Sequence, residues 1–283
     1  MKNLLKADFY RARKDKLLLI GLLVSIGLVL MQVLLIKGIV ATSGAEADAD
    51  AVGTMLGTSG MALWFNGISI LGNTTQYIIP IFLTIFFIKE FSDRTIRNKL
   101  ILGYSRSQIF FSIIIVHAVV AVIIYLATSI TGLLFGTLLF GFGTTFTAET
   151  FAMLVIGFVI EFLLSYVLIG FAIIFAVNKQ SMVLGIVIPI VVATIISILG
   201  VVSVVASENF TKVLSFFNFY QATEIQGMVS INELTMVTWI ERGEDIRYAL
   251  PLTPLARILI VTPIAITLEL VIGYLRFKKI QFK

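Results

Sequence analysis

Three ionisable side chains fall inside long apolar runs: His117, Glu161 and Glu269. Because a charged group is costly in hydrocarbon, such residues usually face a bundle interior or a cavity, and each is a candidate for a substrate pathway. At about 1.5 Å per helical residue, His117 lies about 12 Å and Glu269 about 8 Å from the inner ends of their runs, whereas Glu161 lies near 24 Å. His117 and Glu269 could therefore pair. Two interpretations stay open, a polar clamp within the bundle and a substrate pathway.

The residue inventory argues against catalysis by this chain. No cysteine is present, which excludes disulfides and thiolate metal sites, and a single histidine excludes the H-E-x-x-H zinc motif. Neither a G-x-x-x-x-G-K-[ST] phosphate loop nor a G-x-S-x-G nucleophile elbow occurs. We therefore expect no catalytic residue, no metal site and no cofactor in this chain.

Composition places the chain in a membrane. It has 283 residues, of which 59% are hydrophobic and 13% charged, with a mean hydropathy of +1.05; about a quarter of the residues of a soluble domain are charged. The basic N-terminus precedes an apolar run of about 20 residues without an evident small-residue cleavage site, so we expect a retained anchor rather than a signal peptide. The basic residues flank apolar runs, which argues against nucleic-acid binding.

The sequence predicts an all-α integral membrane protein, with one transmembrane domain over residues 1–283. Six windows are apolar and long enough to cross a hydrocarbon core of about 30 Å as helices. These windows are 17–36, 68–88, 109–135, 151–177, 182–206 and 256–275. Residues 1–16 put Leu5, Phe9 and Ala12 on one side, which predicts an amphipathic helix in contact with membrane lipid.

Charge predicts the orientation. Most of the 21 Lys and Arg residues lie before residue 17, between 89 and 108, at Lys179 and after residue 275. Since Lys and Arg collect on the cytoplasmic side of a membrane, both termini are predicted to be cytoplasmic.

The charged insert between the second and third windows, KEFSDRTIRNKLILGYSRSQ, predicts a short capped helix. Ser92 and Asp93 are suited to cap its start, Thr95–Leu102 would be helical, and Gly103 suits a left-handed stop. Ile96, Leu100 and Ile101 fall on one side, with basic residues around the rest. Those basic residues are Arg94, Arg97 and Lys99. Two interpretations stay open, a solvated loop and a helix gripped by a soluble partner through Ile96 and Leu100.

The predicted external segments differ in composition. Residues 40–66 predict a mobile loop, with a short helix near 52–56. Residues 207–255 begin with an aromatic cluster, which predicts either an interfacial belt or a segment that dips between the spans. The cluster consists of Phe210, Phe216, Phe217, Phe219 and Tyr220. Gly132-x-x-x-Gly136 would let another helix approach the third window closely.

Residues Glu90 through Arg106 follow the pattern E-F-x-D-[RG]-T-[IL]-x-x-x-L-x-x-[GP]-x-[ST]-R. This arrangement resembles the coupling helix of the membrane subunits of ABC exporters of the ABC-2 type. The similarity extends to the N-terminal LLKADFYRARKDK, the external VLSFFNFYQ and the basic ending YLRFKKIQFK, so it covers nearly the whole chain.

The resemblance implies a division of labour. A separate ABC ATPase subunit, present in two copies, would bind ATP and Mg and drive the spans through residues 93–103. A second permease subunit, identical or related, would complete the pathway, with the second and fifth spans near the shared axis and the aromatic cluster in an external gate. The residues implied in coupling are Glu90, Asp93, Arg94, Thr95, Ile96, Arg97, Lys99, Leu100 and Arg106.

The resemblance also implies export of a hydrophobic or amphipathic substrate, a peptide or a drug, across a bacterial plasma membrane. The alternative is an ATP-independent carrier or a peptide-immunity protein. A carrier favours inverted repeats with broken helices, and no clear repeat relates the two halves of this sequence.

Overall fold

The computed structural model describes residues 1–42, 59–66, 74–92, 95–143, 146–179 and 254–280, with some positions between 183 and 198. All regular structure in these residues is helical, as the sequence predicts. The helices are α1 (Lys2–Lys14), α2 (Lys16–Thr42), α4 (Gly60–Asn66), α5 (Thr74–Ser92), α6 (Thr95–Ile101), α7 (Arg106–Phe140), α8 (Ala148–Lys179) and α13 (Pro254–Lys279).

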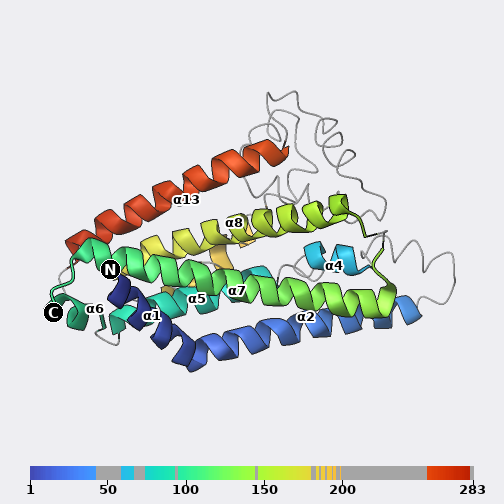
Figure 1. The fold of residues 1–283 in the computed structure, drawn as a ribbon, viewed down its shortest axis with the longest axis horizontal. Helices are drawn as coiled ribbons and strands as arrows, with labels where there is room; N and C mark the ends of the chain where they lie inside the picture. The colour runs from blue at the N-terminus through green and yellow to red at the C-terminus, as the bar shows by residue number, and fades with distance from the viewer. Residues whose placement is uncertain are drawn as a thin grey trace.

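Helix α7 is the central element of the bundle. It runs nearly the full length of the molecule, and α1, α2, α4, α5, α8 and α13 all pack against it (Figure 1). Its buried face includes Phe110, Ile113 and Tyr125, which join the main hydrophobic core with Phe87 of α5 and Ile169 of α8. The opposite face exposes large apolar residues such as Ile123, as expected for a surface that meets lipid.

Three helices are long and apolar enough to cross a membrane among the described residues. They span Lys16–Thr42, Arg106–Phe140 and Leu259–Lys279. The windows 68–88 and 151–177 fall largely on α5 and α8, which run four and two residues further at their C-terminal ends. Within the window 182–206, the described positions between 183 and 198 are helical, and the rest lie outside the described residues.

One end of the bundle gathers elements that are far apart in the sequence. Both termini and α6 lie at this end, where α1 also begins (Figure 1). Arg106, at the start of α7, donates a hydrogen bond of 2.8 Å to the carbonyl of Ile280, and Phe277 packs on Phe110 and Phe91 with ring centroids 5.4 and 5.9 Å apart. The end of α13 is therefore tied to the end of α5 and the start of α7. We call this the terminal end.

At the opposite end, α4 is packed into the bundle, so the prediction of a mobile loop over 40–66 is wrong for these residues. Leu63 and Trp64 are buried, and the Trp64 indole donates a 2.9 Å hydrogen bond to the Leu154 carbonyl of α8. The close approach comes from the predicted glycines: a Cβ at Gly132 would lie 2.6 Å from the Leu63 carbonyl oxygen, and one at Gly136 2.7 Å from Leu63 Cδ1. The absence of side chains at Gly132 and Gly136 therefore allows α4 to pack directly against α7. The helix predicted near 52–56 lies outside the described residues.

Adding a methyl group at Gly132 tests this packing. Because the new Cβ would meet backbone rather than a movable side chain, we expect Gly132→Ala to lower the free energy of unfolding by about 1–3 kcal/mol. Gly27→Ala on α2 is the control, since a Cβ there has no neighbour within 4 Å. Thermal unfolding in detergent measures both variants; equal midpoints would show that α4 does not rest on Gly132.

Candidate functional site

Helix α6 has a well-defined end. Gly103 has a φ of +85°, the left-handed conformation that glycine adopts at low cost. The Gly103 N–H donates to the Leu100 carbonyl at 3.0 Å and the Tyr104 N–H to the Lys99 carbonyl at 3.2 Å, the two hydrogen bonds of a Schellman motif. The stop predicted at Gly103 is confirmed. The predicted cap Asp93 and its neighbour Arg94 lie outside the described residues.

The two faces of α6 differ from those that the sequence predicts. Ile96 is 1% exposed and belongs to the main core, and Leu100 packs against that core. They were predicted to insert into a partner, and instead they anchor α6 to its own bundle. The exposed face consists of Arg97 and Asn98, followed by Ile101 and Leu102, each 75% exposed. A partner approaching from outside therefore meets Ile101 and Leu102.

Lys99 was predicted to belong to an exposed basic collar, and this prediction is wrong. The residue is 6% exposed, and its ammonium lies 2.7 Å from Asp8 Oδ1 of α1 and 3.3 Å from Glu90 Oε2 of α5. Burial lowers the pKa of Lys99, and the hydrogen bond with Asp8 opposes that shift. A buried ammonium is stable only with such partners, so α6 is fixed to both helices.

Asp8 extends the contact to α7. The Asp8 Oδ2 atom accepts a 2.7 Å hydrogen bond from the Ser112 hydroxyl, and Asp8 is only 4% exposed. The buried stripe of α1 is therefore Leu4, Asp8 and Ala12 rather than the predicted stripe that includes Phe9, whose side chain is exposed. The reason is electrostatic, because pairing Asp8 with Lys99 turns this polar residue inward.

Glu90 completes the arrangement. Besides Lys99 of α6, it pairs with Arg11 of α1, so this one carboxylate of α5 contacts two other helices. We name Asp8, Arg11, Glu90 and Lys99 the ionic cluster. Beside it, Lys89 lies 3.0 Å from Asp15, the residue that separates α1 from α2. The cluster therefore joins α1, α5 and α6, and Ser112 adds α7.

The start of α7 is fixed by a capping box. The Ser105 hydroxyl accepts a hydrogen bond from the Gln108 N–H, and the Gln108 side chain accepts one from the Ser105 N–H. This pattern, a serine followed three residues later by glutamine, is visible in the sequence. Arg106, predicted to take part in coupling, is turned toward α13, where it donates to backbone carbonyls. Thr95 begins α6 and is partly buried.

A family model described as "ABC-2 family transporter protein" matches residues 4–200, which contain the ionic cluster and α6. The chain belongs to this ABC-2 transporter family. A search of curated proteins gave no match. The match confirms the family that the residues around Glu90 through Arg106 resemble.

Membership of the ABC-2 family fixes the broad character of the protein. It is a multi-pass integral membrane protein and the permease component of an ABC-2 type transporter. The family domain is a transmembrane subunit without a catalytic ATPase domain; ATP generally binds to a separate ATPase subunit, which is the usual partner of such permeases.

The ionisable residues within the ABC-2 permease bundle do not form the predicted pair. His117 is fully buried, with Nε2 3.0 Å from the Leu83 carbonyl and the ring against Phe87 and Tyr166. Glu269 of α13 is also buried, and its Oε2, which has no hydrogen-bond partner among the described residues, points at Gly170 of α8. The two side chains have different contacts: His117 meets the Leu83 carbonyl and the Phe87 and Tyr166 rings, whereas Glu269 is directed at Gly170.

Other predicted site residues cannot be placed. Glu161 lies on α8, but its side chain is outside the described residues, as are Phe210, Phe216, Phe217, Phe219 and Tyr220 of the predicted external gate. Sequence reasoning missed Asp8, Arg11 and Ser112. One signal for Asp8 was available, since an acidic residue four positions from both Leu4 and Ala12 lies on their side of a helix.

Removing one member of the ionic cluster tests its contribution to stability. Lys99→Met removes the positive charge that pairs with the buried carboxylates of Asp8 and Glu90. Removing one partner of a buried ion pair lowers the free energy of unfolding by about 3–5 kcal/mol. We expect a clearly lower unfolding midpoint in detergent. Arg97→Gln, on the exposed face of the same helix, is the control and should change stability by no more than about 0.5 kcal/mol. Similar midpoints for both variants would contradict a stabilising cluster.

Proposed function

We propose that this chain is the membrane subunit of an ATP-driven exporter and that an ABC ATPase subunit grips it at the exposed face of α6. The supporting observation is the two-sided character of α6. Ile101 and Leu102 are each 75% exposed at the tip of a helix whose other face is buried. Large apolar side chains exposed beside polar ones mark a protein-binding surface.

The inner face of α6 supplies the mechanical connection. Ile96 packs in the core, and Lys99 pairs with Asp8 and Glu90, so α6 cannot move without α1 and α5 unless buried charges are separated. Packed interiors transmit displacement as rigid bodies because they are poorly compressible. A push on Ile101 and Leu102 would therefore shift α6, α1 and the adjoining ends of α5 and α7 together.

The remaining assignments follow from this arrangement. ATP and Mg would bind on the ATPase partner, present in two copies, and a second permease subunit, identical or related, would complete the pathway. Both termini and α6 would face the cytoplasm, because all three lie at the terminal end of the bundle, where basic residues gather (Figure 1). Of the proposed coupling residues, Arg97 is exposed, whereas Ile96, Lys99, Leu100 and Glu90 act from inside.

For the substrate, we propose a hydrophobic or amphipathic molecule, a peptide or a drug, that enters partly from the bilayer. The spans are strongly apolar, with few ionisable groups at depth, which suits an apolar cargo better than a highly charged one. Glu161, His117 and Glu269 are proposed for the pathway and the aromatic cluster after residue 207 for the external gate. Glu269 and His117 are the better supported, because Glu269 Oε2 and His117 Nδ1 are buried without a hydrogen-bond partner in the described part of the chain.

Charged substitutions on the exposed face of α6 test the docking surface. Ile101→Asp with Leu102→Asp should abolish retention of the ATPase subunit on purification and its stimulation by the permease, because two carboxylates would be desolvated in the contact. Lys279→Asp is the control, since it changes the net charge equally at another exposed position of the terminal end. Retention of the ATPase by the double variant would place its contact elsewhere. Transport that proceeds without any ATPase would contradict the exporter.

Neutral substitutions at the intramembrane carboxylates test the pathway. In vesicles that hold the permease and its ATPase, Glu269→Gln and Glu161→Gln should each lower ATP-dependent uptake of a labelled amphipathic peptide by tenfold or more, without loss of ATPase binding. Glu149→Gln, in the first turn of α8, is the control variant. Undiminished uptake would remove that carboxylate from the pathway and leave a structural role.

A further inference from the structure

A cavity of ≈340 Å³ opens where α1 meets α2, beside the end of α5. Its volume lies within the range of roughly 300–1,000 Å³ that is usual for small-ligand sites. Four of its lining residues are basic and two are acidic. The lining consists of Arg11, Lys14, Asp15, Lys16, Leu17, Phe86, Lys89 and Glu90.

The two carboxylates of the cavity are already neutralised. Asp15 pairs with Lys89 and also accepts a 2.8 Å hydrogen bond from the Leu17 N–H, so it caps α2. Glu90 pairs with Arg11 and Lys99. Lys14 and Lys16, by contrast, make no ion pair within the described part of the chain; Lys14 lies 5.9 Å from the ring centroid of Tyr10. The cavity therefore has an excess of positive charge and favours an anion.

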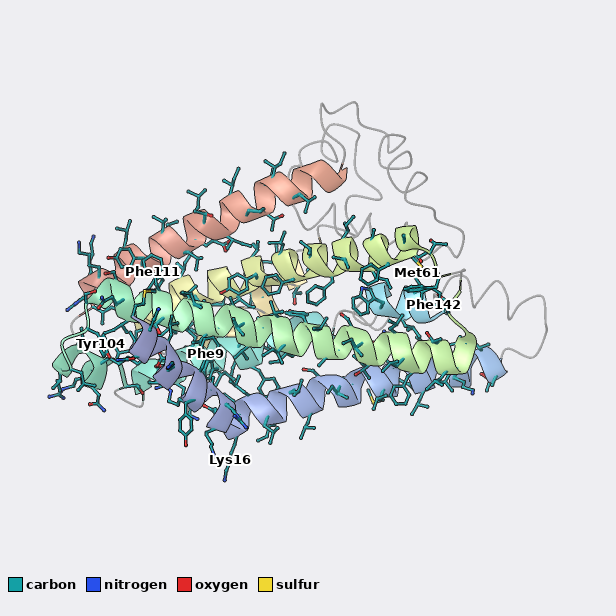
Figure 2. All side chains as sticks on the ribbon, in the orientation of Figure 1. Phe9, Lys16, Met61, Tyr104, Phe111 and Phe142 are labelled. Carbon is teal, nitrogen blue, oxygen red and sulfur yellow. The ribbon has the colours of Figure 1, made fainter. Side chains whose placement is uncertain are left out.

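The surroundings of the cavity are apolar and exposed. Tyr10 of α1 is 67% exposed, and Phe9 is exposed beside it, while Leu19 and Ile20, just inside α2, are more than half exposed. Figure 2 shows Lys16 at the junction of α1 and α2, on the margin of the bundle. Basic side chains next to exposed aromatic and aliphatic ones, at the start of a membrane-spanning helix, are typical of a membrane interface. A small soluble anion would gain nothing from these apolar neighbours.

We propose that this cavity binds the phosphate headgroup of an anionic phospholipid from the leaflet on the side of the termini. Lys14 and Lys16 would contact the phosphate, and the acyl chains would lie along Leu19 and Ile20. Because the cavity shares Arg11 and Glu90 with the ionic cluster, a bound lipid would hold α1 and α2 against the end of α5. The inference requires a membrane protein but no ATPase, so it can be tested on the purified chain alone.

The test measures lipid bound to the full chain in detergent by native mass spectrometry, with phosphatidylglycerol as the anionic probe and phosphatidylcholine as the zwitterionic one. We expect bound phosphatidylglycerol to exceed phosphatidylcholine and to fall by about 25-fold in Lys14→Gln with Lys16→Gln, since each of the two lysines near an anionic surface contributes about fivefold to binding. Lys278→Gln with Lys279→Gln is the charge-matched control and should bind as the unmodified chain does.

A second measurement, thermal unfolding, distinguishes a variant that no longer binds lipid from one that no longer folds. Phosphatidylglycerol should raise the thermal unfolding midpoint of the unmodified chain and of the control, but not of the cavity variant, because only a ligand bound to the folded state stabilises it. Three outcomes would overturn the proposal: equal loss of binding in the control, unchanged binding in the cavity variant, or full competition by inorganic phosphate, which would indicate a soluble anion.

Discussion

The burial of Lys99 is the constraint on which the terminal end depends. An ammonium removed from water is stable only if carboxylates lie close to it, and here they come from α1 and α5, through Asp8 and Glu90. Each of these carboxylates has a second partner, Ser112 of α7 and Arg11 of α1. Separating α1, α5 or α6 would leave a buried charge unpaired, and separating α7 would remove a hydrogen bond from Asp8, so the four helices are held as one unit at this end.

This constraint explains why α6 has one face inside the bundle and one outside. A helix of seven residues is too short to be stable alone in water, so its conformation depends on the contacts of Ile96, Lys99 and Leu100. With those residues inside, the 3.6-residue period leaves Arg97, Asn98 and Ile101 outside. Family membership identifies the chain as a permease component, and the exposed face is where we place its ATPase.

The two ends of the bundle are held by different interactions. At the terminal end, charges and capped helices tie α1, α6 and α13 to α7. At the other end, glycines let α4 lie directly on the backbone of α7, and Trp64 contacts α8 through its hydrogen bond to Leu154 and its packing on Phe158. Ion pairs resist separation but allow side chains to rotate, whereas backbone contact through glycine allows little displacement. The proposed lipid cavity lies at the terminal end, next to the ion pairs. Because α1 and α5 both line it, a small displacement of one helix relative to the other would change its shape.

Much of the architecture followed from the sequence alone. Long apolar runs dictate helices, because a chain in hydrocarbon must satisfy its backbone hydrogen bonds internally, and basic flanks mark where those helices end. Gly103 likewise marks the end of the short helix α6. The pattern at Glu90 through Arg106 was enough to indicate the family. Each of these features depends on residues close together in the sequence, so the sequence alone is enough to predict it.

What only the tertiary structure decided is which side chains face one another. Lys99 reads as a surface lysine and Asp8 as a polar residue of an interfacial helix, yet 91 positions of chain separate the two partners and no periodicity links them. The same holds for His117 and Glu269, whose similar depths suggested a pair, although His117 Nε2 lies 3.0 Å from the Leu83 carbonyl and Glu269 is directed at Gly170. Periodicity fixes how residues of one helix are arranged relative to each other, but the rotation of that helix is set by its neighbours, which here means by the need to pair a buried charge.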